Sequence, residues 1–135
     1  MYKKERKELI LYRLEQSFDK ENEIISHINN GYYSTAVNRI YYSIYYSITA
    51  LAILYKFETS KHKQLIGWFN KEFVHKGVFD KDLSKIAIKL FEKRNKGDYE
   101  PFIEFEKDEV LIMYSEMKEF IETIKSFVNS KIDNT

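Results

Sequence analysis

An arginine ends an apolar helical stripe in the second half of the chain. Leu83, Ala87 and Leu90 recur at three- and four-residue steps, and Arg94 occupies the next inward position. A guanidinium on an inward face is costly unless a partner or an anion meets it, and its planar shape suits phosphate. The same spacing also fits an internal ion pair, or a side chain that reaches outward to water. All three interpretations of Arg94 stay open.

Polar residues follow Arg94 directly. Asn95 could orient a ligand or cap the helix end, and Asp98 and Tyr99 come within six residues of the arginine. A cation, a carboxylate and a phenol in this order could bind a phosphate and move protons beside it. Arg94, Asp98 and Tyr99 are therefore the candidate catalytic residues. Because an ordinary tyrosine is a poor base near neutral pH, such a catalyst is expected to be slow.

Tyrosines crowd an earlier helical segment, where six of them occur between residues 32 and 46. Asn38, Tyr42, Tyr45 and Thr49 share one helical face, and Arg39 lies beside Tyr42. Tyrosines this dense pack with wet hydroxyls more often than they stack on bases, and they also suit a subunit interface. From this helix we assign Asn38, Arg39 and Tyr42 to the candidate ligand-binding set.

A second basic segment, Ser60-Lys61-His62-Lys63, begins another predicted helix. Backbone N–H groups, lysines and a titratable imidazole would together suit an anion. Ordinary surface lysines at a loop-to-helix junction are the alternative. Lys61, His62 and Asn95 complete the candidate ligand-binding residues.

Apolar spacing predicts five helices that would position these groups, over residues 5–29, 32–57, 60–76, 80–96 and 106–131. Short connections between long amphipathic helices predict an all-α fold, an antiparallel four- to five-helix bundle formed by one domain over residues 1–135. The first helix is expected to turn Leu11, Leu14, Phe18, Ile25 and Ile28 inward.

Capping residues predict where these helices begin and end. Thr59 or Ser60 is expected to cap the third helix and Asp80 the fourth, while Gly97 and Pro101 are expected to stop the fourth. A helix that breaks at Gly97 would open space beside Arg94.

Composition narrows the possible functions. The chain has 22 basic and 21 acidic residues, too balanced for a protein that binds nucleic acid through net charge alone. The charge is uneven along the chain, because residues 56–96 hold eleven basic and five acidic groups and residues 97–135 hold four and ten. Pairing between neighbouring helices is one interpretation of this asymmetry, and a phosphate-binding basic surface is the other.

The sequence contains no cysteine, and its three scattered histidines have no zinc-like spacing, so we predict no metal and no cofactor. The N-terminus is charged and unlike a signal peptide, and the longest apolar run is too short for a bilayer. We therefore expect a cytoplasmic protein with no membrane association.

Four segments in order give the chain its resemblance to a known family. They are Asn38-Arg39-Ile40-Tyr41-Tyr42-Ser43-Ile44-Tyr45, Lys61-His62, Phe73-Val74-His75-Lys76-Gly77 and Arg94-Asn95-Lys96-Gly97-Asp98-Tyr99. Together they resemble the HEPN superfamily of small prokaryotic helical domains, and the match runs over nearly the whole chain.

The resemblance implies a helical bundle that forms a homodimer with a shared cleft. Active relatives are metal-independent ribonucleases, often toxins partnered by a small nucleotidyltransferase antitoxin. Their signature is an arginine, usually followed by a polar residue, with a histidine a few residues later. Arg94 and Asn95 match the first half, but no histidine occurs after His75. Proton transfer would then fall to Asp98, Tyr99, or His62 from elsewhere in the dimer.

Three functions follow from these observations. The first is a homodimer that binds nucleotide or RNA phosphates through Arg94, paired with a nucleotidyltransferase in a toxin–antitoxin-like system. The second is a weak, metal-independent endoribonuclease toxin. The third is a structural dimeric adaptor without a ligand, in which Arg94 and Asp98 form an internal ion pair.

Overall fold

The structure is a computed structural model that describes residues 3–134. Over these residues the chain is all-α, as predicted, with six α-helices, a π-helical turn and a 3-10 turn. The elements are α1 (Lys3–Phe18), α2 (Glu21–Asn29), α3 (Tyr33–Leu54), α4 (His62–Phe69), η1 (Asn70–Val74), α5 (Lys81–Tyr99), α6 (Lys107–Lys131) and η2 (Ile132–Asn134).

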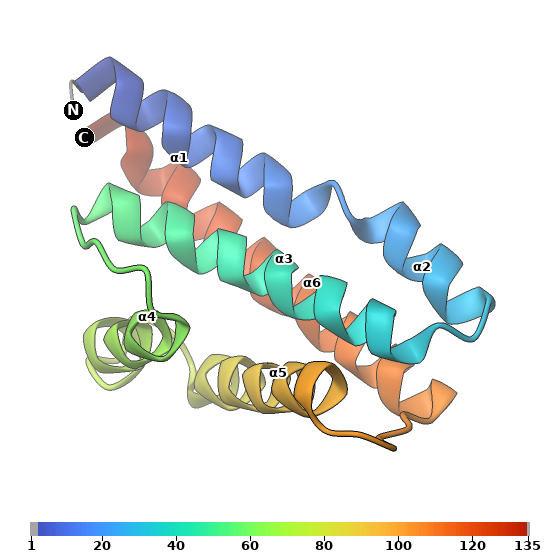
Figure 1. The fold of residues 1–135 in the computed structure, drawn as a ribbon. Helices are drawn as coiled ribbons and strands as arrows, with labels where there is room; N and C mark the ends of the chain where they lie inside the picture. The colour runs from blue at the N-terminus through green and yellow to red at the C-terminus, as the bar shows by residue number, and fades with distance from the viewer. Residues whose placement is uncertain (1–2, 135) are drawn as a thin grey trace.

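Consecutive long helices run in opposite directions (Figure 1). α1 and α2 lead away from the N-terminus, α3 returns, α5 runs outward again and α6 comes back to the starting end. An ion pair of 3.0 Å between Lys7 and Asp133 joins α1 to η2 at that end. None of the helices in the described part of the chain is long and apolar enough to cross a membrane.

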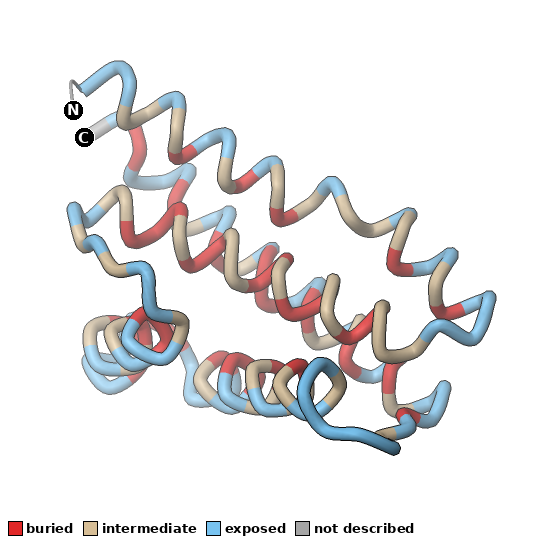
Figure 2. Tube along the Cα trace, viewed as in Figure 1, coloured by how far each residue is buried: buried red, intermediate tan, exposed pale blue. Residues whose placement is uncertain are grey.

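Helix α3 is the centre of the bundle, since it contacts α1, α2, α4, α5 and α6. Buried positions along α3 and α6 turn toward neighbouring helices, whereas the outer turns of α1 are exposed (Figure 2). Apolar spacing along α3 predicts an inward stripe of six residues, Val37, Tyr41, Ile44, Ile48, Leu51 and Tyr55. The first five are buried, which confirms most of the stripe, but the prediction is wrong at Tyr55, which is exposed just after the helix ends.

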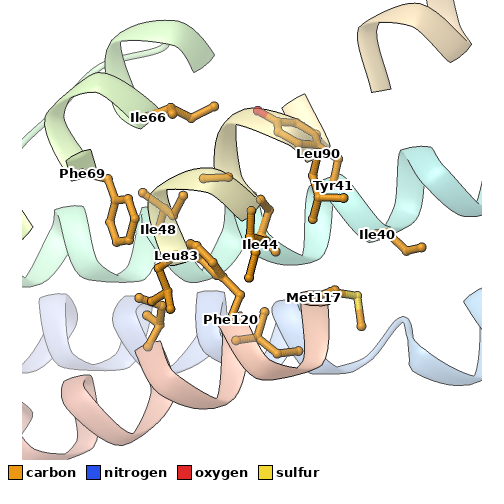
Figure 3. Close-up of a cluster of buried hydrophobic side chains, with 14 of the residues drawn as sticks. Ile40, Tyr41, Ile44, Ile48, Ile66, Phe69, Leu83, Leu90, Met117 and Phe120 are labelled. Atoms are coloured by element: carbon orange, nitrogen blue, oxygen red, sulfur yellow. The ribbon is translucent and has the colours of Figure 1, made fainter. Parts of the chain in front are cut away.

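The apolar core closes around α3 from three sides. Ile44 and Ile48 of α3, Phe69 of α4, Leu83 of α5 and Phe120 of α6 meet in one cluster (Figure 3). The rings of Phe69 and Phe120 lie 5.4 Å apart, within the range at which aromatic rings attract one another. This packing holds α4 and α5 against α3, where the candidate site residues lie.

The predicted first helix is wrong in two respects. Residues 5–29 form two helices, because the chain leaves the helical path at Asp19 and Lys20. Leu11 and Ile25 are exposed, while their neighbours Ile10 and Ile24 are buried instead. Apolar residues are adjacent in both places, so three- and four-residue spacing alone did not decide which of each pair turns inward.

The two predicted N-terminal caps have different outcomes. Asp80 caps α5 as predicted, since its carboxylate accepts a hydrogen bond from the Asp82 backbone N–H at 3.3 Å. The predicted cap of the third helix is wrong: α4 begins at His62, after Lys61. The Thr59 hydroxyl instead accepts a hydrogen bond from the Lys61 backbone N–H at 3.2 Å in the preceding turn.

The prediction that Gly97 stops α5 is also wrong, because the helix continues to Tyr99. A Cβ atom at position 97 would lie 2.9 Å from a ring carbon of Phe105, a buried residue of the following loop. Gly97 therefore allows Phe105 to pack against the helix. Because α5 stays helical, Asp98 lies one turn beyond Arg94 on the same face.

Gly97→Ala is expected to lower the free energy of unfolding by about 1 kcal/mol, because the new methyl group overlaps Phe105 and outweighs the gain in helix propensity. Gly67→Ala is the matched control, since a Cβ in that α4 position meets nothing within 4 Å. That variant should gain about 1 kcal/mol. Urea unfolding measures the free energy of unfolding of both variants, which should change in opposite directions. Stabilisation by Gly97→Ala would contradict close packing of Phe105 against this position.

Candidate functional site

Arg94 lies at the inner face of α5, where the sequence places it. Leu83, Ala87, Leu90 and Arg94 are all buried, and the arginine is only 7% exposed. The alternative in which this side chain reaches outward to water is therefore wrong for the single chain. A buried cation needs compensating partners, so its surroundings decide what the site can do.

Aromatic rings provide most of that compensation. The guanidinium carbon lies 4.8 Å from the ring centre of Tyr41 and 5.5 Å from that of Tyr42, both on α3. Phe91 and Tyr99 of α5 lie at 5.7 and 6.0 Å. The electron-rich faces of such rings attract a cation, most strongly where water is excluded. Two helices thus form an aromatic enclosure for one positive charge.

Polar partners of the guanidinium are few and distant. One terminal nitrogen, Nη1, lies 3.8 Å from a carboxylate oxygen of Asp98, which is an ion pair but not a hydrogen bond. The other, Nη2, lies 3.5 Å from Nδ1 of His62. The Nε atom is buried and has no hydrogen-bond partner among the described residues. The donors of Arg94 are therefore incompletely satisfied by its own chain.

His62 reaches the site from the first turn of α4. Its Nδ1 atom lies 2.7 Å from the Tyr41 hydroxyl, and its ring stacks on Tyr45 with centres 4.2 Å apart. Burial, together with the nearby Arg94 charge, lowers the pKa of His62. Burial also raises the pKa of Tyr41 despite the opposing effect of Arg94, so its hydroxyl stays protonated.

A chain of hydrogen bonds orients the carboxylate. The Asn38 amide donates to Asp98 at 3.0 Å, and Arg39 donates to the amide oxygen of Asn38 at 2.7 Å. Arg39 also donates to Glu23 of α2 at 3.0 Å, and this bond is the main cause of the lowered pKa of Glu23. The network runs from α2 through α3 to Asp98, which fixes where that carboxylate lies beside Arg94.

The remaining predicted site residues lie at the rim. Lys61 is exposed, Asn95 is half-buried, and Tyr99 is 74% exposed although its ring lies near the guanidinium. An open depression of about 480 Å³ is lined by Glu92, Asn95, Lys96, Tyr99 and Glu100.

Two lysines of α5, within the basic stretch of residues 56–96, form ion pairs with glutamates of α6. Lys89 lies 2.7 Å from Glu116 and Lys93 lies 2.9 Å from Glu109, so α5 and α6 neutralise part of each other's charge. The interpretation of the charge asymmetry as pairing between helices holds for these positions. Over residues 3–134, no three His, Asp or Glu side chains gather as they would to hold a metal ion.

Sequence reasoning missed Tyr41 as a site residue. It was assigned to the core stripe of α3, and it is indeed fully buried. Its hydroxyl nevertheless contacts His62, and its ring is the nearest to Arg94. A tyrosine hydroxyl on an inward stripe needs a polar partner, and this requirement could have identified it.

Comparison with known proteins agrees with the all-α fold. The model of the HEPN domain matches residues 10–127, so the chain belongs to the HEPN domain family. A Thermotoga maritima protein named "UPF0332 protein" is 35% identical over 101 residues, which cover 75% of this chain and 76% of that protein.

Two relatives from Methanocaldococcus jannaschii have names that point to a toxin. "Putative toxin MJ0142" is 29% identical over 130 residues, covering 96% of this chain and 86% of the relative. "Putative toxin MJ0605" is 32% identical over 96 residues, covering 71% of each chain.

The lowered pKa of His62 makes stability depend on pH. The folded protein holds this imidazole neutral more strongly than the unfolded chain does, so the unfolded state binds more protons. The free energy of unfolding should fall as pH drops through and below the unfolded-state pKa of about 6.5. Urea unfolding at several pH values from above to below that point measures how steeply the free energy of unfolding depends on pH. His62→Gln should reduce this slope. His75→Gln, which alters an exposed ring after η1, should keep the wild-type slope; a His62→Gln slope equal to wild type would contradict this assignment.

Proposed function

We propose that this HEPN-domain protein binds RNA or nucleotide phosphates at Arg94. The observation behind the proposal is the state of the guanidinium: it is buried on aromatic faces, its Nε has no hydrogen-bond partner among the described residues, and its carboxylate lies beyond hydrogen-bond distance. A phosphate oxygen offers the charge and the acceptors that such a group lacks.

Access to the guanidinium would involve its most exposed neighbours. Asp98 has a side chain 28% exposed, and Tyr99 is largely exposed above the same charge. Displacement of these two side chains would open one edge of the guanidinium while Tyr41 and Tyr42 continue to hold its face. The bound phosphate would then replace Asp98 as the counter-charge of Arg94.

The assembly we infer is a homodimer that works with a nucleotidyltransferase in a toxin–antitoxin-like system. Membership of the HEPN family and the toxin names of two relatives support this setting. Tyr99 is exposed beside Arg94, and Phe102 is exposed three residues later in the chain; such aromatic residues are suited to an interface. Sedimentation equilibrium and co-purification with such an enzyme test the two parts separately.

Arg94→Met is expected to weaken binding of a fluorescent single-stranded RNA about tenfold or more, because it removes a charge-assisted contact but fills the same volume. Arg94→Lys should also weaken binding, since an ammonium cannot replace a bidentate guanidinium. Lys85→Ala removes an exposed charge from the same helix and should stay within about twofold.

Fluorescence anisotropy at about 0.15 M salt measures these affinities, and circular dichroism verifies folding. Equal losses in Arg94→Met and Lys85→Ala would show diffuse electrostatic binding and would contradict the proposed site. The same RNA incubated in EDTA tests the ribonuclease alternative: cleavage that Arg94→Met abolishes would favour an enzyme.

Asp98→Asn should have the opposite effect on affinity. The amide can still meet Asn38, but it no longer repels a phosphate that approaches Arg94. Binding of the same RNA is expected to tighten roughly threefold or more. Glu100→Gln, which removes an exposed charge two residues later, is the matched control. An unchanged affinity in Asp98→Asn would contradict the exchange of carboxylate for phosphate.

A further inference from the structure

Two polar groups converge on one nitrogen of His62. The Tyr41 hydroxyl lies 2.7 Å from Nδ1, and an Arg94 terminal nitrogen lies 3.5 Å from the same atom. The hydrogen bonds that His62 makes to described residues all reach this nitrogen. The ring itself is held between Tyr45, stacked at 4.2 Å, and Tyr42, which meets it edge-on at 5.8 Å. Its orientation is therefore fixed by packing as well as by hydrogen bonds.

These contacts determine which ring nitrogen has the proton. A guanidinium can only donate, so the Nδ1 atom that faces Arg94 must present its lone pair. The Tyr41 hydroxyl can then donate to that lone pair as well, because a buried phenol keeps its proton. The proton of the neutral imidazole is consequently on Nε2, the nitrogen left free for a ligand.

The groups around the ring also oppose a positive charge on it. From α3 it faces the phenols of Tyr41, Tyr42 and Tyr45, and from α5 it faces the cation of Arg94. Lys61 and Lys63 flank it in the chain, and no described carboxylate forms an ion pair or hydrogen bond with it. Its lowered pKa agrees with this geometry.

We propose that His62 is a fixed, neutral hydrogen-bond donor to the bound RNA, acting through Nε2–H and transferring no proton. This role rests on the phosphate-binding function proposed for Arg94. Because the two nitrogens of an imidazole ring point in nearly opposite directions, the Nε2–H points away from Arg94 and meets an oxygen of a neighbouring phosphate instead of the phosphate that Arg94 binds. Arg94 and His62 would together recognise two successive phosphates of the RNA backbone.

The proposal also separates binding from cleavage. In strand cleavage the 2′-hydroxyl attacks phosphorus, its proton passes to a base, and the bond to the 5′-oxygen breaks as that oxygen gains a proton. A base needs a free lone pair, but the only one on His62 is engaged by Tyr41 and Arg94. An efficient acid would be the imidazolium, which the surroundings disfavour. His62 thus equips the site to bind RNA without cutting it.

Nitrogen NMR of the ligand-free protein tests the tautomer directly. At a pH above 7 the ¹⁵N spectrum of His62 should show a protonated Nε2 and an unprotonated Nδ1. Arg94→Met should raise the pKa of His62 relative to wild type, because it removes the neighbouring cation. A protonated Nδ1, or a His62 titration that ignores Arg94→Met, would overturn the proposal whatever the affinity for RNA.

Two substitutions then test the donor role. His62→Gln places an amide N–H near the position of Nε2 and cannot titrate, so it should keep RNA binding within about threefold of wild type. His62→Ala should lose about tenfold or more, as expected for a lost hydrogen bond to a charged group. Equal losses in both variants, or metal-free RNA cleavage that disappears in His62→Gln, would overturn the proposal.

Phosphate binding at Arg94 and the donor role of His62 can fail separately. If Arg94→Met binds RNA as tightly as wild type, the proposed function fails even though the NMR result stands. If Arg94→Met loses binding while His62→Ala keeps it, the phosphate site stands and the role of His62 is wrong.

Discussion

The attraction between one buried guanidinium and the faces of surrounding aromatic rings is the interaction on which the rest of the site depends. Arg94 is 7% exposed, yet no described carboxylate lies within hydrogen-bond distance of it. Tyr41 and Tyr42 of α3 and Phe91 of α5 supply weak but water-excluded stabilisation. The arrangement keeps the cation in place while its Nε–H has no hydrogen-bond partner among the described residues, whereas a tight internal salt bridge would occupy its donors.

The scaffold is built around this requirement. Helix α3 contributes two of the rings, α5 contributes the cation and the other rings, and both helices are fixed by apolar packing against α4 and α6. Gly97 leaves room for Phe105 against α5, and the helix continues to Tyr99, which places Asp98 one turn from Arg94. The Asn38 amide, itself contacted by Arg39, donates a hydrogen bond to that carboxylate. This hydrogen bond limits how firmly Asp98 can neutralise the guanidinium.

The amino-acid sequence predicts a large part of this arrangement. The all-α fold and the buried stripe of α5 that ends at Arg94 follow from helical spacing alone. Asp98 lies one turn from Arg94 because α5 continues past Gly97, where the sequence predicted that it stops. The sharing of the site by His62 and Tyr41 does not follow, because 32 residues separate His62 from Arg94 and only tertiary packing unites them. Sequence reasoning placed His62 elsewhere in a dimer, whereas it contacts Arg94 within one chain. The break at Asp19 and the continuation of α5 past Gly97 were also missed; a glycine fits within α5 there because the absent Cβ leaves room for Phe105.

The chain belongs to the HEPN domain family, but its sequence departs from the signature that the resemblance implies, an arginine followed closely by a histidine. The histidine beside Arg94 comes from another helix, and its Nδ1 atom already has two neighbours in the chain. This difference favours the proposed binding role over cleavage.

The Nε–H group of Arg94 offers the most direct measurement of the central claim. The chain has four arginines, so the ¹H–¹⁵N spectrum of their Nε groups is simple, and the Arg94 signal is identified by its loss in Arg94→Lys. On titration with a single-stranded RNA oligomer the account predicts a saturable downfield shift of this signal, as a donor without a partner gains an anionic acceptor. An Arg94 signal that stays in place while the protein becomes saturated with RNA would contradict it.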